Sequence, residues 1–278
     1  MLKSIKLLLR RMYAFVVRDF QLALSYRLQF LLRIMTILFM VTTLFFISRT
    51  FIGGSECPCA ESPFTQWRDP LAAWITGLAV LNYFMTGFSS LATAIRAEQV
   101  QGTLESVLLT PISIPTVIAA SSAWDFVQAT FFSFLYLFFG WLFFNVHFQG
   151  SFLLALLFLL LTTLVLACLG ILSASFAMVF KRGDPFGVLL GTGSALFSGV
   201  FFPTQLLGTG FGHISRLLPP TYGLDGIRRV LIEGQGLMQV REPLITLSLF
   251  LAVLLPFSLW VFGRAVRRAK REGSLIQY

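Results

Sequence analysis

Apolar residues occur along this chain in six long runs, separated by short polar segments or by segments containing Pro and Gly. A run of about 20 apolar residues is long enough to cross the roughly 30 Å hydrocarbon layer as an α-helix. The runs are Ile34 to Ile52, Leu71 to Ile95, a run within Thr116 to Val146, Phe152 to Phe180, Phe186 to Phe202, and Leu244 to Gly263. This pattern predicts an all-α integral membrane protein with six transmembrane helices in a single transmembrane domain, residues 1–278.

Two of the six runs depart from a simple straight span. The fifth run has about 17 residues, which rise only about 25 Å as a helix. We therefore expect its outer end to stop inside the membrane, or neighbouring irregular backbone to complete the crossing. The sixth run contains Pro256, which predicts a kink.

Composition and charge agree with a membrane protein and indicate its orientation. The 278 residues are 56% hydrophobic and only 12% charged, which argues against a disordered chain or a soluble globule. Of the 21 Lys and Arg residues, 15 fall in the two termini and in the loops on the same side. The positive-inside rule then predicts a multi-pass protein of the plasma (cell inner) membrane with both termini in the cytoplasm. Topology and anionic membrane lipid explain the net charge of +9, so no nucleic-acid partner is expected.

The two ends of the chain flank a six-span core at residues 28–263. Residues 1–27 are expected to form an amphipathic cytoplasmic helix lying in the membrane interface, with basic residues on another face. A plain basic lead-in to the first span fits the same residues equally well. Residues 264–278 are expected to form a basic cytoplasmic tail.

The cytoplasmic segment between the second and third spans is also amphipathic. Its apolar residues fall on one helical face: Val100, Leu104, Val107 and Leu108. Glu98 and Glu105 lie on another face, and Pro111 marks the end. Such a helix either transmits force from a soluble partner or rests on the lipid headgroups.

The outer segment between the fifth and sixth spans, residues 203–242, is too apolar for a free loop and too interrupted for a span. After Pro219 and Pro220, the spacing of Leu224, Ile227 and Leu231 predicts an amphipathic helix. One or two re-entrant or interfacial helices packed against protein fit this segment. Its aromatic and basic residues either steer an amphiphile or form an ordinary interfacial belt; they are Phe211, Tyr222, Arg228 and Arg229.

Small residues recur at intervals of four in the fifth run: Gly187, Gly191, Ala195 and Gly199. This small-xxx-small pattern lets two helix backbones approach closely in lipid. It is compatible with a contact between two copies, with a flexible wall of a transport pathway, or with tight packing inside one subunit.

Few side chains suggest reactive chemistry. Asp125 lies within a span, where a charge is costly, so a proton-linked or coupling role and a pairing with a basic residue at the interface both remain open. Cys57 and Cys59 flank Pro58 and are either bridged or free. No metal site, cofactor motif, P-loop or hydrolase motif is found, so the chain is not expected to be an enzyme.

Three motifs in the expected order resemble those of type-2 ATP-binding-cassette (ABC) export permeases. The cytoplasmic signature is RAEQVQGTLESVLLTP at residues 96–111, and SGVFFP at residues 198–203 resembles the end of span five. Pro220-Thr221-Tyr222 followed by Arg228 resembles the outer re-entrant region, as does Pro203 before it.

The resemblance implies a half-transporter in which two permease subunits, identical or different, pair and bind two cytoplasmic ATPase subunits. It implies an exporter of an amphiphile such as a drug, lipid or glycan, driven by ATP hydrolysis on those partners. It assigns the coupling helix to the segment that contains Glu98, Gly102, Thr103, Leu104, Glu105 and Pro111. The alternative is an ion-gradient-driven secondary transporter, or a lipid-handling membrane protein, in which Asp125 is the proton-linked residue.

Overall fold

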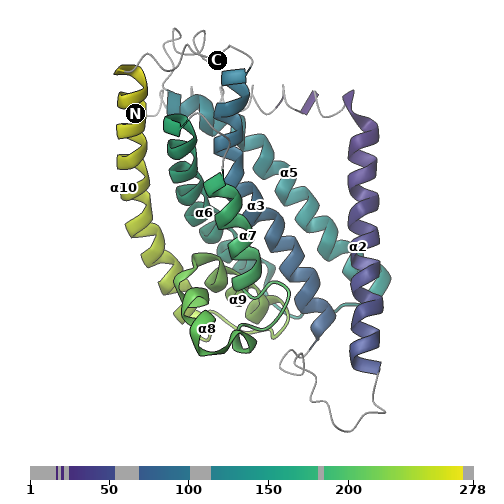
Figure 1. Cartoon of the computed structure of the whole chain (residues 1–278). Coiled ribbons are helices and arrows are strands. Elements are labelled where there is room, and N and C mark those ends of the chain that lie inside the picture. Colours follow the sequence, from purple (N-terminus) through teal and green to yellow (C-terminus); the bar gives the residue numbers. More distant parts are fainter. Residues whose placement is uncertain are drawn as a thin grey trace.

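The computed structural model describes residues 25–53, 69–100, 114–180 and 185–271, together with residues 17, 20 and 21. The regular structure in this part of the chain is helical, and the long helices run side by side as a bundle (Figure 1). In chain order the elements are α2 (Arg27–Gly53), α3 (Pro70–Val100), α5 (Ile114–Phe144), α6 (Phe152–Phe180), α7 (Pro185–Phe197), η1 (Thr204–Leu207), α8 (Gly208–Leu217), α9 (Pro219–Leu231) and α10 (Arg241–Arg271).

Five of these helices are long and apolar enough to cross a membrane: α2, α3, α5, α6 and α10. They coincide with the first four and the last of the predicted spans, which confirms an integral membrane helical protein. The fifth run is different, because α7 ends at Phe197 and is too short to cross by itself. The residues that follow form turns rather than helix, in agreement with the expected irregular backbone.

Helix α3 is the centre of the bundle. In its most apolar 18-residue stretch 78% of the residues are buried, against 11% in α2 and in α10. Helix α6 packs along α3 at two glycines: a Cβ added to Gly87 would lie 2.6 Å from the Cβ of Leu166, and one added to Gly170 would lie 2.2 Å from the carbonyl oxygen of Gly87. Close backbone approach at small residues is how helices associate in lipid.

Helix α5 packs on another side of α3 through polar side chains as well as apolar ones. The Ser133 hydroxyl donates to the Ala79 carbonyl at 2.6 Å, and the Tyr83 hydroxyl donates to Thr130 Oγ1 at 2.6 Å. Interhelical hydrogen bonds of this kind add to packing where no water competes. Together α3, α5 and α6 form the core against which α2, α7, α9 and α10 pack.

The two ends of the chain are described to different extents. Helix α10 bends along its length and continues through Pro256 to Arg271, so residues 264–271 of the expected basic tail are helical (Figure 1). Most of the predicted N-terminal helix at residues 1–27 lies outside the described residues, as do Cys57 and Cys59. Within that region the Phe20 ring meets Trp124 of α5 edge to face.

Candidate functional site

The best-defined polar site lies at the end of the bundle that carries η1, α8 and α9, here called the α8–α9 end (Figure 1). It begins with the turn after α7. Gly199 has a φ of +83°, a left-handed conformation that favours glycine. Helix α7 ends at Phe197, just before this turn, and the carbonyl groups of Gly199 and Val200 in the turn accept hydrogen bonds from α9.

Arg228 of α9 holds this turn against α3. Its guanidinium donates to the Gly199 carbonyl at 2.6 Å, to the Val200 carbonyl at 3.1 Å, and twice to the Ala73 carbonyl of α3 at 2.8 and 3.2 Å. A guanidinium carries five donors and no acceptor, so one side chain can satisfy several carbonyl groups together. Burial lowers the pKa of Arg228 to about 9, while the Asp225 carboxylate opposes that decrease, and the side chain stays charged at neutral pH.

The sequence interpretation of Arg228 as a steering or belt residue therefore needs correction. Its guanidinium is committed to backbone carbonyls of two segments, α3 and the turn after α7, and so joins both of them to α9. A second side chain supports the same turn, since the Trp74 indole N–H donates to the Phe201 carbonyl at 2.8 Å. Asp69 caps the start of α3 nearby, accepting from the Ala72 N–H at 3.1 Å.

Helix α9 is seated on α6 by two glycines. A Cβ at Gly223 would lie 2.2 Å from Thr162 Oγ1, and one at Gly226 would lie 2.3 Å from the Phe158 ring. The apolar side chains that predicted this amphipathic helix are buried, namely Leu224, Ile227 and Leu231. The segment after Pro219 and Pro220 is thus a helix packed on protein, as expected from its sequence.

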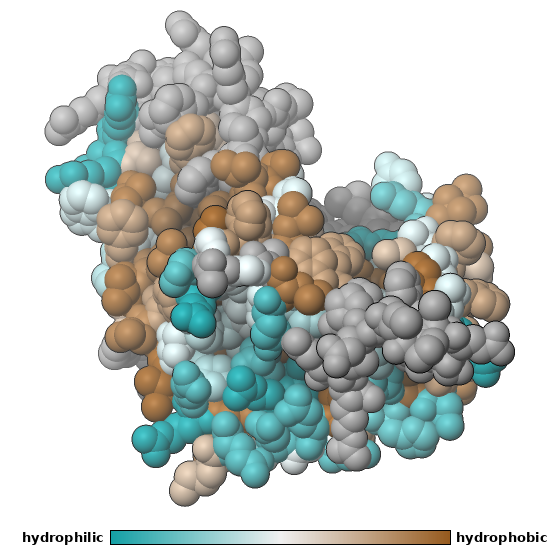
Figure 2. All heavy atoms as spheres, turned by 60° about the horizontal axis from the view of Figure 1, so that its bottom comes forward, coloured by the Kyte–Doolittle hydropathy of each residue, from teal (hydrophilic) through white to brown (hydrophobic). Residues whose placement is uncertain are grey.

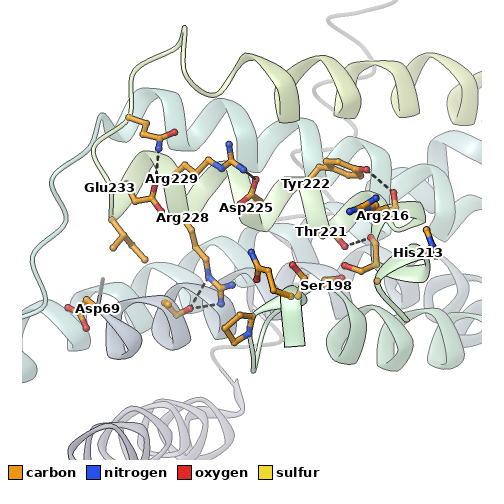
Figure 3. A pocket seen from close by; sticks show the side chains of 18 of the residues that line it. Asp69, Ser198, His213, Arg216, Thr221, Tyr222, Asp225, Arg228, Arg229 and Glu233 are labelled. Carbon is orange, nitrogen blue, oxygen red and sulfur yellow. Dashed lines mark hydrogen bonds and ion pairs between the residues drawn. The ribbon is translucent and has the colours of Figure 1, made fainter. Parts of the chain in front are cut away.

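A pocket of about 800 Å³ opens between these elements (Figure 3). It is lined by the start of α3, the turn after α7, and one side each of α8 and α9. Pro203 and Tyr222, which the sequence singled out, both line it with Arg228, and Pro220 is buried at the start of α9. The residues that line it are mostly polar, in contrast to the apolar membrane-length helices of the bundle.

Several charges in the pocket already have partners. Arg229 pairs with Asp225 at 2.9 Å, and the Gln235 side-chain amide donates to Glu233 at 2.7 Å. The Tyr222 hydroxyl donates to the backbone carbonyl of Arg216 at 2.9 Å, which ties α9 to the last turn of α8. Figure 3 shows His213 and Arg216 at one end of the pocket and Asp69 and Glu233 at the other.

Helix α8 has two different faces. Gly212, His213 and Arg216 line the pocket, while large apolar side chains are exposed elsewhere on the helix: Phe211, Ile214 and Leu217. Figure 2, in which the α8–α9 end is turned toward the viewer, shows hydrophilic side chains gathered there and apolar side chains over the flanks of the bundle. This distribution is typical of a segment at a membrane–water interface.

The small-residue stripe of the fifth run is divided between two structures. Gly187, Gly191 and Ala195 lie in α7, whereas Gly199 belongs to the turn beyond it. The stripe is buried against the rest of the chain, and a Cβ on Gly191 would lie 3.2 Å from Met85 Sδ of α3. This is the geometry of packing inside one subunit, one of the three alternatives.

The predicted coupling segment falls between α3 and α5 in the sequence, and α3 ends and α5 begins at the opposite end of the bundle (Figure 1). Glu98 lies in the last turns of α3. Gly102, Thr103, Leu104, Glu105 and Pro111 lie outside the described residues. Asp125 of α5 lies near enough to Arg33 of α2 for an electrostatic interaction, which fits the expected pairing with a basic residue.

Sequence reasoning missed the contribution of four residues to the α8–α9 end. Trp74 read as one more apolar residue of a span, although its N–H secures the turn. Ser198 was noted only as part of a motif, yet its hydroxyl is buried and lines the pocket. His213 and Arg216, three residues apart on α8, carried a usable signal, because that spacing puts both on one helical face.

The fold and this site define a polytopic helical membrane protein with a polar pocket at one end and, among the described residues, no cluster of metal ligands. Comparison with protein-family models matches residues 6–232 to the ABC-2 type transporter family. The chain belongs to this family and is a membrane permease component of an ABC transporter. Comparison with curated proteins gives no match.

Proposed function

We propose that this chain is the membrane subunit of an ABC exporter that moves an amphiphile out of the cytoplasm. The supporting observation is the family match over residues 6–232, which includes the coupling signature and the α8–α9 end. The chain contains no P-loop, so ATP hydrolysis belongs to a separate cytoplasmic subunit, present in two copies with two permease subunits. The cargo is a drug, lipid or glycan.

The arrangement of the helices supports a plasma-membrane orientation with the α8–α9 end outside. The C-terminal end of α3, the start of α5 and the C-terminal end of α10 lie at the other end of the bundle (Figure 1). That end of α10 carries Arg264, Arg267, Arg268 and Arg271. An excess of basic residues marks the cytoplasmic side, which is where an ATPase would reach Glu98 and Glu105.

Transport in this proposal is a change in population between two conformations of the permease. ATP binding closes the ATPase pair, and the coupling segment passes that movement to α3 and α5, between which it lies. An ATPase can favour the outward-open conformation only if it interacts differently with the two conformations. Fixed charges on the coupling segment, Glu98 and Glu105, provide such a differential contact, and Gly102 allows close approach.

An uncoupling variant tests this proposal. In vesicles containing the permease and a soluble P-loop ATPase encoded beside it, Glu105→Arg should leave ATP hydrolysis but abolish most ATP-driven transport. Glu242→Arg, the same change at an exposed position of the α8–α9 end, is the matched control and should transport normally. Normal transport by Glu105→Arg would contradict the coupling role, and transport driven by an ion gradient without ATP would favour the secondary transporter.

Cysteine labelling tests the orientation separately. In a variant without Cys57, Cys59 and Cys168, we expect Gly210→Cys to react with a membrane-impermeant maleimide in intact cells. A Cβ at Gly210 meets no atom within 4 Å, so the new thiol is tolerated. Thr103→Cys should react only after permeabilisation, and the reverse pattern would place the coupling segment outside and refute the proposal.

A further inference from the structure

The pocket at the α8–α9 end contains polar groups that the fold itself does not use. Ser198 lines the pocket and is only 2% exposed, and its hydroxyl, buried in the pocket wall, has no hydrogen-bond partner among the residues that the structure describes. A buried hydroxyl left without a partner is unfavourable, because it has lost its hydrogen bonds to water and gained none. Such a group in a pocket wall is therefore available to a ligand.

Arg216 is the second uncommitted group. It is exposed on α8, lines the pocket, and its guanidinium makes no hydrogen bond or ion pair within the described part of the chain. His213 lies one helical turn earlier and lines the same end (Figure 3). A cation in the last turn of a helix is also favoured by the helix dipole, so Arg216 alone would not indicate a ligand. The buried hydroxyl of Ser198, which has no hydrogen-bond partner among the described residues, is a second and independent indication of a ligand.

The acids of the pocket do not compete for this end. Asp225 is paired with Arg229, Glu233 accepts from Gln235, and Asp69 caps α3. Figure 3 shows Asp69 and Glu233 displaced toward the opposite end from Arg216. The groups still free to bind are therefore donors, one of them a guanidinium, which suits an anionic oxygen group such as a phosphate.

We infer that this pocket binds the phosphate-bearing headgroup of an amphiphile, held by Arg216 and His213 with Ser198 as a buried hydrogen-bonding group. The amphipathic character of α8 favours an amphiphile over a soluble anion. Its apolar side chains Phe211, Ile214 and Leu217 are exposed beside the pocket, so acyl chains would have an apolar surface next to the headgroup. That the pocket receives cargo on its way out rests on the proposed exporter function; the binding itself does not.

Calorimetric titration of the purified permease, without an ATPase, tests the site. The permease in phosphatidylcholine nanodiscs is titrated with dihexanoyl phosphatidic acid and with dihexanoylglycerol, which has the same chains and no phosphate. We expect saturable binding of the first only, weakened at least tenfold by Arg216→Gln and less by Ser198→Ala. Arg241→Gln, an exposed arginine outside the pocket, should change the affinity less than twofold.

Two results of this titration would overturn the inference. One is equal binding of the phosphate-free analogue, and the other is equal affinities of Arg216→Gln and Arg241→Gln for phosphatidic acid. If inorganic phosphate displaces dihexanoyl phosphatidic acid at a similar concentration, the site recognises the phosphate alone. If it does not, the site also requires the acyl chains. If ATP-driven transport persists but phosphatidic acid does not bind, this site is refuted and the proposed exporter function stands. If phosphatidic acid binds but there is no ATP-driven transport, the exporter function is refuted and the site stands.

Discussion

Two arginines attach peripheral parts of this molecule to its core, and they do so with different strength. Arg228 is part-buried and makes four hydrogen bonds of 2.6–3.2 Å to carbonyls of α3 and of the turn after α7. Arg33 of α2 is exposed. It donates one long hydrogen bond, 3.4 Å, to the side-chain oxygen of Asn82, and its guanidinium lies 4.1 Å from the centre of the Phe132 ring. The α8–α9 end is thus fixed to α3, whereas α2 is loosely attached.

The surroundings of the two arginines show the same difference. Helix α9 inserts Gly223 and Gly226 against α6, so its backbone is closely packed. Only 11% of the apolar stretch of α2 is buried, and Leu28, Phe39 and Phe46 are largely exposed on it. In a permease that changes conformation, we expect the α8–α9 end to move with α3 and α2 to move separately from it, because loosely packed elements open at low cost.

Removing the Arg228 side chain should have the largest effect. Arg228→Met leaves the carbonyls of Gly199, Val200 and Ala73 without their donor, and we expect a loss of at least about 3 kcal/mol, because each hydrogen bond to a charged group contributes about 1.5–3 kcal/mol. Thermal unfolding of the purified permease in detergent measures this. Arg229→Met, which breaks only the partly exposed pair with Asp225, should cost less than about 1 kcal/mol. Equal unfolding temperatures for the two variants would show that Arg228 does not hold this end.

Gly199→Ala should have an intermediate effect. A left-handed φ costs a residue with a Cβ about 1–2 kcal/mol, and here the new atom would also lie 2.9 Å from Thr204 Cγ2. Gly234→Ala is a matched control, because Gly234 also has a positive φ, +68°, but its Cβ would meet only Gln149, at an ordinary contact distance of 3.7 Å. Thermal unfolding should rank Gly199→Ala below Gly234→Ala in stability, and the reverse order would mean that the turn after α7 is not closely packed.

Apolar runs predicted the long helices of this fold well, because a helix that faces lipid and the protein core is apolar along nearly its whole length. Five of the predicted spans are helices of membrane length. Periodicity also predicted α9, whose Leu224, Ile227 and Leu231 are buried at helical spacing.

The contacts that build the α8–α9 end were not predictable in the same way. Arg228 donates to Ala73, 155 positions away, and Trp74 donates to Phe201, 127 positions away, so neither partner is visible in any local pattern. The four-residue spacing from Ala195 to Gly199 suggested a continuous helix, but the left-handed φ of Gly199 ends the pattern. A glycine allows both outcomes, and tertiary contacts with Arg228 decide between them.

Arg33→Met should have the smallest effect on stability and a specific effect on α2. A cation over an exposed ring contributes about 0.5–1 kcal/mol, and a 3.4 Å hydrogen bond adds little, so thermal unfolding should change by less than about 1 kcal/mol. The loss should instead show in the position of α2. Spin labels at Phe39 of α2 and Phe134 of α5, both exposed, should give a broader distribution of label-to-label distances in Arg33→Met than in the parent, measured by double electron–electron resonance.

Arg27→Met is the control. It removes a charge from the first residue of the same helix but keeps the Asn82 and Phe132 contacts, and its distance distribution should match the parent's. If Arg33→Met also matches the parent, the apolar contacts of α2 with α3 and α5 suffice to fix it, and the contrast with the α8–α9 end no longer depends on the two arginines.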